Sequence, residues 1–225
     1  MIITASIDMA KERYRAILFD NDGVLIDTEH LYYRANREIL KKAGIDLTEE
    51  MFVEYFLRQG EGLWKLLPAA DYSPDEVERF RNERNRLYYS MLQNIGGLID
   101  GVRETLIVLR EQYAMGIVTS CRKSHFDAMH AQTDIIPLFD FVLTRESYEH
   151  SKPHPEPYLL ALERAGVRAD DAVVVEDSER GLAAAKAAGI DCVVIPRGLT
   201  AGGDFQGALV VLDSITALPG IIFPS

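Results

Sequence analysis

The sequence predicts an α/β fold: a Rossmann-like parallel sheet with helices on both faces, and an all-helical segment inserted after the first strand. Two observations predict it. From residue 98 onward, short apolar runs alternate with helical patterns, as in parallel strands joined by crossover helices. Within residues 28–97, helical signals dominate and strand signals are absent. We therefore expect residues 1–27 and 98–225 to form one core and residues 28–97 a helical unit.

The core elements are predicted from apolar runs and their turn signals. The run RAILFD predicts a buried strand at residues 15–20, and Asp22-Gly23 predicts the turn after it. The later elements are expected as a helix at 101–112 and a strand at 114–118, a helix at 124–132 and a strand at 141–144, a helix at 155–165 and a strand at 172–176, a helix at 179–188 and a strand at 192–195, and a last strand at 209–212.

The inserted segment predicts three helices. Apolar residues spaced four apart predict a first helix that ends at Gly44, and a second helix is expected near Thr48. The third starts after Ser73, where a capping box is combined with proline at the first helical position, and is expected to run to Ile95. Gly96-Gly97 then predicts a hinge back to the core.

Composition and charge exclude several classes of function. The 225 residues carry 24 Lys and Arg against 35 Asp and Glu, a net charge of −11 that repels a polyanion and argues against nucleic-acid binding. The two cysteines, Cys121 and Cys192, have no zinc-binding spacing. No apolar run approaches the ~18 residues of a membrane helix, and no signal peptide is evident. We expect a cytoplasmic protein without a membrane partner, monomeric or, as the alternative, homodimeric.

Polar residues follow four of the predicted strands, at the edge where open parallel sheets bind their ligands. Alone, each group reads as an ordinary turn, a helix cap or a solvated loop charge. A calcium-binding loop is disfavoured, because its first ligand position would be Leu18, which cannot coordinate a cation, and a strand pattern instead of a helix precedes it. The convergence on one edge indicates a site, and its members are Asp20, Asp22, Thr119, Ser120, Lys152, Glu176 and Asp177.

The chemistry of this group points to phosphoryl transfer. Its four carboxylates cannot all stay ionised without compensation, and hard oxygen ligands suit Mg²⁺. Mg²⁺ and Lys152 together supply the positive charge that a phosphate ester needs in such a site. One aspartate can act as nucleophile, and a second, two residues along, can protonate the leaving oxygen and later activate water.

Four motifs identify a resemblance. LFDNDGVLIDTE, IVTS, SKPHPEPY and VVVEDSERGLAAAKAAG resemble, in order and spacing, the motifs of haloacid dehalogenase superfamily hydrolases. The match spans roughly residues 17–200, and the nearest subgroup is the beta-phosphoglucomutase-like phosphatases. In that family a mobile helical cap follows the first motif. The resemblance therefore implies a catalytic core with a cap over residues 28–97.

The resemblance also implies a role for each site residue. Asp20 is the expected nucleophile and Asp22 the general acid and base. Thr119 and the backbone at Ser120 are expected to bind the phosphoryl group, and Lys152 to bridge it to the nucleophile. The expected Mg²⁺ ligands are Asp20, Asp177 and the main-chain carbonyl of Asp22, with Glu176 at the metal directly or through water. The second aspartate also argues against a dehalogenase.

The expected activity is that of a Mg²⁺-dependent phosphatase for a small phosphorylated metabolite of the sugar or polyol class. A phosphomutase is the alternative, and a non-enzymatic phosphate-ligand sensor a more remote one. Mutases of the subgroup have a cap histidine and a cap arginine, and here Tyr32 and Gln59 align with them. A mutase must hold two phosphates, so the lack of this histidine and arginine at the aligned positions favours the phosphatase. The candidates for substrate specificity, each of which could also belong to a solvated helix face, are Arg58, Gln59, Lys65 and Arg84.

Overall fold

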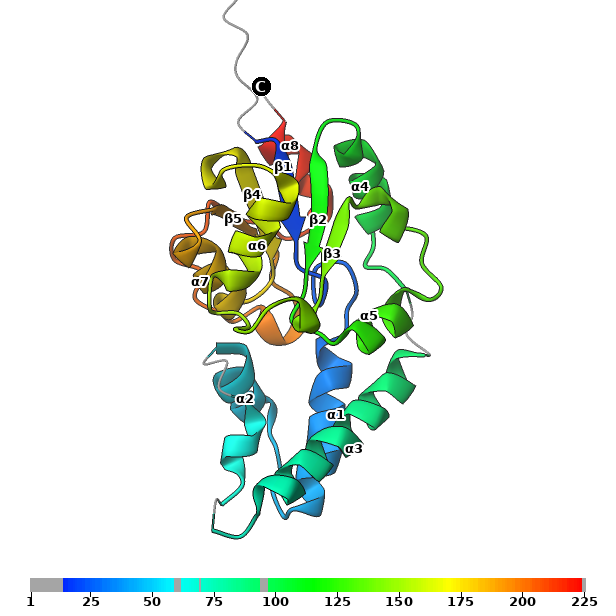
Figure 1. The fold of residues 1–225 in the computed structure, drawn as a ribbon, viewed down its shortest axis with the longest axis vertical. Helices are drawn as coiled ribbons and strands as arrows, with labels where there is room; N and C mark the ends of the chain where they lie inside the picture. The colour runs from blue at the N-terminus through cyan, green and yellow to red at the C-terminus, as the bar shows by residue number, and fades with distance from the viewer. Residues whose placement is uncertain (1–13, 59–61, 69, 94–96, 224–225) are drawn as a thin grey trace, which may run out of the picture.

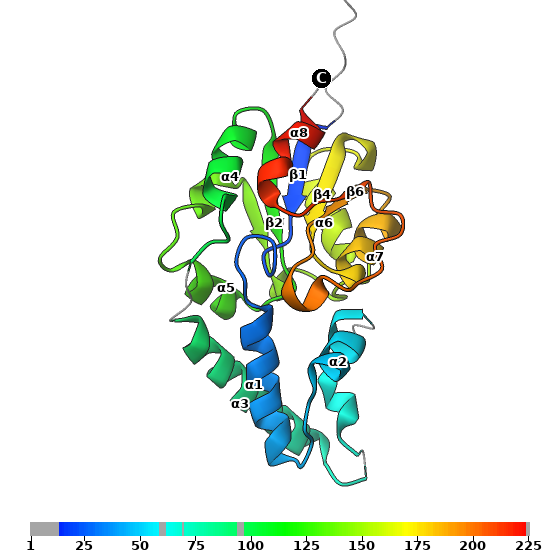
Figure 2. The ribbon, with the colours of Figure 1, turned by 180° about the vertical axis from the view of Figure 1, so that it is seen from behind.

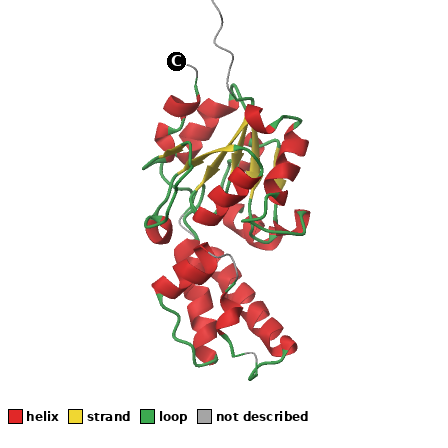
Figure 3. Cartoon of the chain, turned by 90° about the vertical axis from the view of Figure 1, so that its left-hand side faces the viewer, coloured by secondary structure: helices red, strands yellow, loops and turns green. Residues whose placement is uncertain are grey.

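The computed structural model describes residues 14–58, 62–68, 70–93 and 97–223 (Figure 1). The described residues form two parts at opposite ends of the molecule (Figure 3). One part contains the sheet, and the regular elements of the other are all helices. One sheet of parallel strands has the order β3-β2-β1-β4-β5-β6. The strands are β1 (Ala16–Phe19), β2 (Ala114–Val118), β3 (Phe141–Leu143), β4 (Ala172–Glu176), β5 (Asp191–Val194) and β6 (Val210–Val211).

The predicted α/β fold is confirmed. Strands β2 and β4 have the predicted bounds, and the other four differ by one residue at one end or at both. Strand β1 lies in the middle of the sheet because it pairs with β2 on one side and with β4 on the other. All four of its side chains are buried, as its uninterrupted apolar run requires in a sheet that is covered on both faces.

Alternate residues of the strands face two separate apolar clusters. Ile17 and Phe19 of β1 pack in one cluster with side chains from α4 (Val102–Arg110), α5 (Lys123–His130) and α8 (Pro219–Ile222). Ala16 and Leu18 pack in the other with α6 (Glu156–Ala165) and α7 (Glu179–Ala187). Figures 1 and 2 show these two helical layers from opposite sides. Short 3₁₀ turns connect the core elements: η3 (Ile136–Leu138), η4 (Arg145–Ser147), η5 (Ala169–Asp171), η6 (Gly198–Thr200) and η7 (Ile215–Ala217).

The inserted segment is helical throughout its described elements. These are α1 (Glu29–Lys42), α2 (Glu49–Phe52), the π-helix η1 (Val53–Arg58), the 3₁₀ helix η2 (Leu63–Leu66) and α3 (Pro74–Leu92). They share an apolar cluster of their own, centred on Leu40, Leu47 and Phe52. The helical part lies beyond the carboxyl ends of the strands, at the end of the molecule away from residue 223 (Figure 2).

Two of the expected helix starts are confirmed and one helix differs from expectation. Ser73 forms a capping box with Glu76 ahead of α3, which ends at Leu92 instead of Ile95. Thr48 caps α2 as expected, but the backbone continues from Val53 as a π-helix, which sequence periodicity did not indicate. The expected hinge at Gly96-Gly97 lies partly outside the described residues. Among those that are described, no helix has the length and apolar character to cross a bilayer.

Candidate active site

The predicted site residues from three strands meet at one edge of the sheet. Asp20 directly follows β1, and Asp177 directly follows its neighbour β4, whose last residue is Glu176. The chain order of the strands reverses about β1, since β2 and β3 lie on one side and β4 to β6 on the other. The residues therefore lie at a topological switch point, the place where open parallel sheets bind their ligands. Thr119 follows β2, and its backbone N–H donates to Leu143 of β3.

Lys152 reaches this edge from the loop before α6 and is almost fully buried, with 4% of its surface exposed. Its Nζ donates to Asp20 Oδ1 at 2.7 Å, to Glu176 Oε1 at 2.7 Å and to the Val118 carbonyl at 2.8 Å. Burial disfavours the charged amine, but the two carboxylates outweigh burial and hold the pKa of Lys152 above its usual value. The ammonium is thus fixed against one oxygen of the predicted nucleophile.

Glu176 has both carboxylate oxygens occupied. Besides Lys152, the Tyr158 hydroxyl donates to Oε1 at 2.7 Å, and the Ser178 hydroxyl and the Asp177 backbone N–H donate to Oε2 at 3.2 Å each. Burial raises its pKa, but Lys152, together with Tyr158 and Arg180, more than offsets this, so the net shift is downward. A Cβ on Gly181 would lie 1.9 Å from the carboxyl carbon of Glu176, so α7 needs glycine there. Sequence reasoning missed Tyr158, although it closes the SKPHPEPY motif.

Asp22 is held by two hydroxyl groups. Thr28 donates to Oδ1 at 2.6 Å and Thr119 donates to Oδ2 at 2.9 Å. The turn between Asp22 and Thr28 requires glycine at position 23, where φ is +80° and a Cβ would come within 2.0 Å of Asp177 Oδ2. Sequence reasoning also missed the positioning hydroxyl of Thr28, because residue 28 marked only the start of the helical segment.

The acidic group has the composition of a magnesium site. Oxygens of Asp20, Glu176 and Asp177 all lie within 4.8 Å of one another, and all three side chains are buried. Burial, with Glu176 and Asp22 nearby, raises the pKa of Asp20 to about 7 despite Lys152. Burial and the neighbouring carboxylates likewise raise the pKa of Asp177 well above its usual value. A divalent cation would neutralise crowded carboxylates of this kind, and their hard oxygen ligands fit Mg²⁺.

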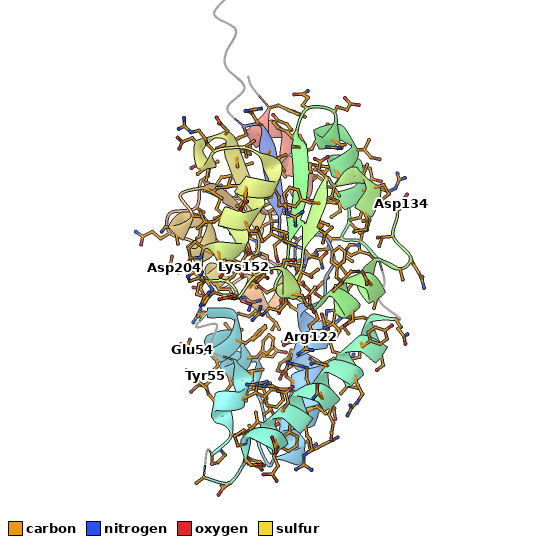
Figure 4. All side chains as sticks on the ribbon, in the orientation of Figure 1. Glu54, Tyr55, Arg122, Asp134, Lys152 and Asp204 are labelled. Carbon is orange, nitrogen blue, oxygen red and sulfur yellow. The ribbon has the colours of Figure 1, made fainter. Side chains whose placement is uncertain are left out.

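A cavity of about 310 Å³ opens from this edge toward the helical part. Figure 4 shows Lys152 at the sheet edge and Arg122 facing the inserted helices. The core contributes carboxylates and several basic side chains to the cavity, and the helical part contributes aromatic, amide and charged side chains. The lining residues from the helical part are Glu29, Tyr32, Phe56, Arg84, Asn85 and Tyr88. Of the predicted site residues, those that line the cavity are Asp20, Asp22, Ser120, Lys152 and Glu176, and the core adds Cys121, Arg122, His125, Arg145, Ser151, Ser178 and Arg180.

The structure separates the four candidates for substrate specificity. Arg84 lines the cavity, where its guanidinium donates to Tyr32 Oη at 2.5 Å and to Asn36 Oδ1 at 2.9 Å. Arg58 instead donates to Glu179 Oε2 at 2.9 Å and connects the helical part to α7. Lys65 is exposed and does not line the cavity, and Gln59 lies outside the described residues.

A histidine beneath the site gives a pH-dependent prediction. His130 is buried and hydrogen-bonded to Asn21 Oδ1 at 2.7 Å, and burial lowers its pKa to about 4. The unfolded chain binds a proton on this imidazole below about pH 6.5, whereas the folded chain does not until about pH 4. Stability therefore falls as the pH falls through this window, by on the order of 3 kcal/mol from His130 alone.

Urea unfolding between pH 7.5 and 4.5 measures this effect. We expect His130→Gln to unfold with a shallower pH dependence than the unmodified protein. His150→Gln, which changes an exposed histidine, is the matched control and should keep the original slope. If the unfolding free energies of all three proteins depend on pH with the same slope, His130 is not the source of this pH dependence.

Comparison with known proteins finds one matching family model and several similar chains. Residues 17–195 match the family model of haloacid dehalogenase-like hydrolases. The chain is 34% identical to the Phosphorylated carbohydrates phosphatase of Thermotoga maritima, over 78% of this chain and 82% of that one. It is 29% identical to Fructose-1-phosphate phosphatase YqaB of Escherichia coli, over 81% and 96%. The crystal structure of CbbY from Rhodobacter sphaeroides in complex with phosphate superposes with a TM-score of 0.78 at 28% identity, covering 91% of this chain and 96% of that one.

Proposed function

Because the chain belongs to the haloacid dehalogenase-like hydrolase family and is a phosphoric monoester hydrolase, we propose that it is a Mg²⁺-dependent phosphatase for a small phosphorylated sugar or polyol. One observation carries the proposal. The buried Lys152 ammonium lies between Asp20 and Glu176, at 2.7 Å from each, at the edge where Asp22 and Asp177 also lie. Such a centre joins a nucleophile, a fixed cation and an acid in one cavity.

The first proposed step is phosphoryl transfer to Asp20. A carboxylate oxygen of Asp20 attacks the phosphorus, the bond from phosphorus to the ester oxygen breaks, and an aspartyl-phosphate forms. The leaving oxygen takes a proton from Asp22. Lys152 neutralises charge on the transferring group, and the Thr119 hydroxyl and the Ser120 backbone N–H hold its oxygens.

The second step is hydrolysis of the aspartyl-phosphate. Asp22, now a carboxylate, takes a proton from a water molecule as the water oxygen attacks phosphorus. The bond from phosphorus to the Asp20 oxygen breaks, which regenerates the Asp20 carboxylate and yields inorganic phosphate. The hydroxyl of Thr28 supports this role, because it donates to Asp22 Oδ1 and fixes this side chain two residues beyond the nucleophile.

Asp20, Asp177 and the main-chain carbonyl of Asp22 are the residues that would hold Mg²⁺. When bound, the ion supplies positive charge to the phosphoryl oxygens and to the crowded carboxylates. Glu176 is proposed to act beside this set, since Lys152, Tyr158 and Ser178 already occupy its oxygens. Its contribution is then to orient Lys152.

The inserted segment, residues 28–97, is proposed to be a cap over the catalytic core of residues 1–27 and 98–225. Two contacts support a closed position. Arg58 of η1 pairs with Glu179 at the start of α7, and the Arg180 guanidinium carbon lies 4.6 Å from the centroid of the Phe56 ring. A cap in this position excludes bulk water from the site during the reaction.

Phosphate release from a panel of sugar, polyol and nucleotide monophosphates, with Mg²⁺ present, tests the proposed function. We expect release to be concentrated on a few related sugar or polyol esters. Turnover only after priming with a sugar bisphosphate, with phosphate moved within the substrate, would instead establish the phosphomutase. If neither phosphate release nor phosphate transfer is observed under either condition, the non-enzymatic phosphate-ligand sensor is the remaining alternative.

Removal of the metal gives a separate prediction. Chelation with EDTA is expected to lower phosphate release by at least about 100-fold, because charge neutralisation by such an ion is worth several kcal/mol in the transition state. Added Mg²⁺ should restore activity, and Asp177→Asn should raise the Mg²⁺ concentration needed by about 10-fold or more. The control is thermal unfolding in EDTA, which should show a folded protein. Full activity in excess EDTA would rule out the metal requirement.

A further inference from the structure

Buried polar atoms without partners mark a second group of residues in the cavity. Among the described residues, four buried side-chain nitrogen or oxygen atoms have no hydrogen-bond partner, and all four belong to side chains that line this cavity. They are Glu29 Oε2, Asn85 Nδ2, Ser120 Oγ and Arg180 Nε. A buried polar atom that stays unpaired costs free energy, so such atoms in a native cavity point to a ligand that completes them. Ser120 belongs to the proposed phosphate site, but the other three do not.

Glu29 and Arg180 reach the cavity from different parts of the chain. Glu29 is the first residue of α1 in the cap, and Arg180 is in the first turn of α7 in the core. Burial raises the pKa of Glu29 to about 8, although the positive charge of Arg180 opposes this. The two side chains influence each other electrostatically, yet Glu29 Oε2 and Arg180 Nε hold no hydrogen bond within the described chain. Each of these atoms is therefore buried in a side chain that lines the cavity, with its hydrogen-bonding capacity unused.

Asn85 adds a donor whose direction is fixed. The Nε of Arg84 donates to Asn85 Oδ1 at 3.0 Å, which leaves Nδ2 as the unused end of the amide. Arg84 is itself held by Tyr32 and Asn36, so the amide cannot turn over without breaking this network. The three open positions thus comprise one carboxyl oxygen and two N–H donors.

Neighbouring hydroxyl groups on a ligand fit this combination of one carboxyl oxygen and two N–H donors. A hydroxyl can donate to a carboxyl oxygen and accept from an N–H or from a protonated carboxyl, so hydroxyl groups can pair with all three atoms in either protonation state of Glu29. We propose that Glu29, Asn85 and Arg180 bind hydroxyl groups on the leaving group of the substrate and thereby select polyhydroxylated monophosphate esters. This inference rests on the proposed function and assigns its substrate class to particular residues.

A pair of esters that differ only in hydroxyl groups tests the inference. The probes are glucitol 6-phosphate and hexyl phosphate, which share a six-carbon chain, and the readout is the ratio of their kcat/KM values. We expect the unmodified enzyme to prefer glucitol 6-phosphate by at least about 100-fold, since a site built for hydroxyls rejects an analogue that lacks them. Glu29→Gln and Arg180→Gln should each lower this ratio by about 10- to 100-fold.

Two further measurements separate recognition from folding and from chemistry. Glu38→Gln, an exposed change on the same helix as Glu29, should keep the original ratio. Should Arg180→Gln fail to fold, calorimetric titration of glucitol 6-phosphate into the Asp20→Asn protein, with and without Glu29→Gln, still measures the loss of binding. A weakening of about 10-fold or more by Glu29→Gln supports the inference.

The outcomes distinguish the inference from the proposed function. If Asp20-dependent release is observed but Glu29→Gln and Arg180→Gln leave the ratio unchanged, or if hexyl phosphate is the better substrate, the inference is wrong and the phosphatase stands. If no ester of the panel gives Asp20-dependent release, the proposed function itself fails, and the inference fails with it.

Discussion

Asp20→Asn is expected to lower phosphate release by about 10⁴-fold or more, the scale seen when a nucleophile is removed from a catalytic group that acts as a unit. The amide has nearly the shape of the carboxylate but cannot form the aspartyl-phosphate. The change should not destabilise the protein. Burial and the nearby Glu176 and Asp22 raise the pKa of Asp20 to about 7, so the ionised form is held at a cost in the folded state. Replacing it with a neutral amide removes like-charge repulsion.

The measurement combines kcat on the preferred ester with thermal unfolding of the same preparation. We expect a melting temperature equal to or above that of the unmodified protein beside the loss of activity. Asp134→Asn, at a distant exposed aspartate that pairs with Arg103, is the matched control and should keep kcat (Figure 4). Retention of substantial release by Asp20→Asn would exclude Asp20 as the nucleophile.

Lys152→Met is expected to lower both activity and stability. Loss of a fixed cation from the transferring phosphoryl group is expected to lower kcat by about 10³-fold. The same change leaves Asp20 and Glu176 buried without their common partner. Breaking a buried ion pair from one side costs about 3–5 kcal/mol, because the remaining charge is uncompensated. The loss of stability should appear in urea unfolding at pH 7.5.

A second variant separates the two effects of Lys152. In the double variant Lys152→Met with Glu176→Gln, a neutral amide replaces the Glu176 carboxylate, so only Asp20 is left as a buried carboxylate without Lys152. Part of the lost stability should therefore return, while activity should stay low. Lys123→Met, which changes an exposed lysine, should unfold within about 0.5 kcal/mol of the unmodified protein. A double variant no more stable than Lys152→Met would show that the unpaired charge is not the cause of the instability.

The strands and most helix starts could be read from the sequence because their signals are local. Strand β1 is a continuous apolar run, and the Ser73 capping box uses residues three apart, so neither depends on distant parts of the chain. The π-helix at Val53 could not be predicted, because its geometry differs from an α-helix by a hydrogen-bonding choice that side-chain periodicity does not encode.

The polar residues after four predicted strands made a site predictable, because parallel strands bring their carboxyl ends to one edge. That argument places a residue at the edge but not its side-chain partners. Tyr158 contacts Glu176 across 18 residues, and Thr119 contacts Asp22 across 97. Neither pairing leaves a periodic trace in the sequence.

By itself, the sequence determined the parallel α/β core, the helical insertion and the resemblance of four motifs to one hydrolase family, since each depends on residue order and spacing along the chain. Only the tertiary structure decided which side chains share a charge or a cavity. It turned Arg58 toward Glu179 and brought Glu29 into the cavity with Arg180. The reason is physical: burial, hydrogen bonding and electrostatic interaction depend on distances in space, and these are set by how the helical insertion packs against the rest of the chain.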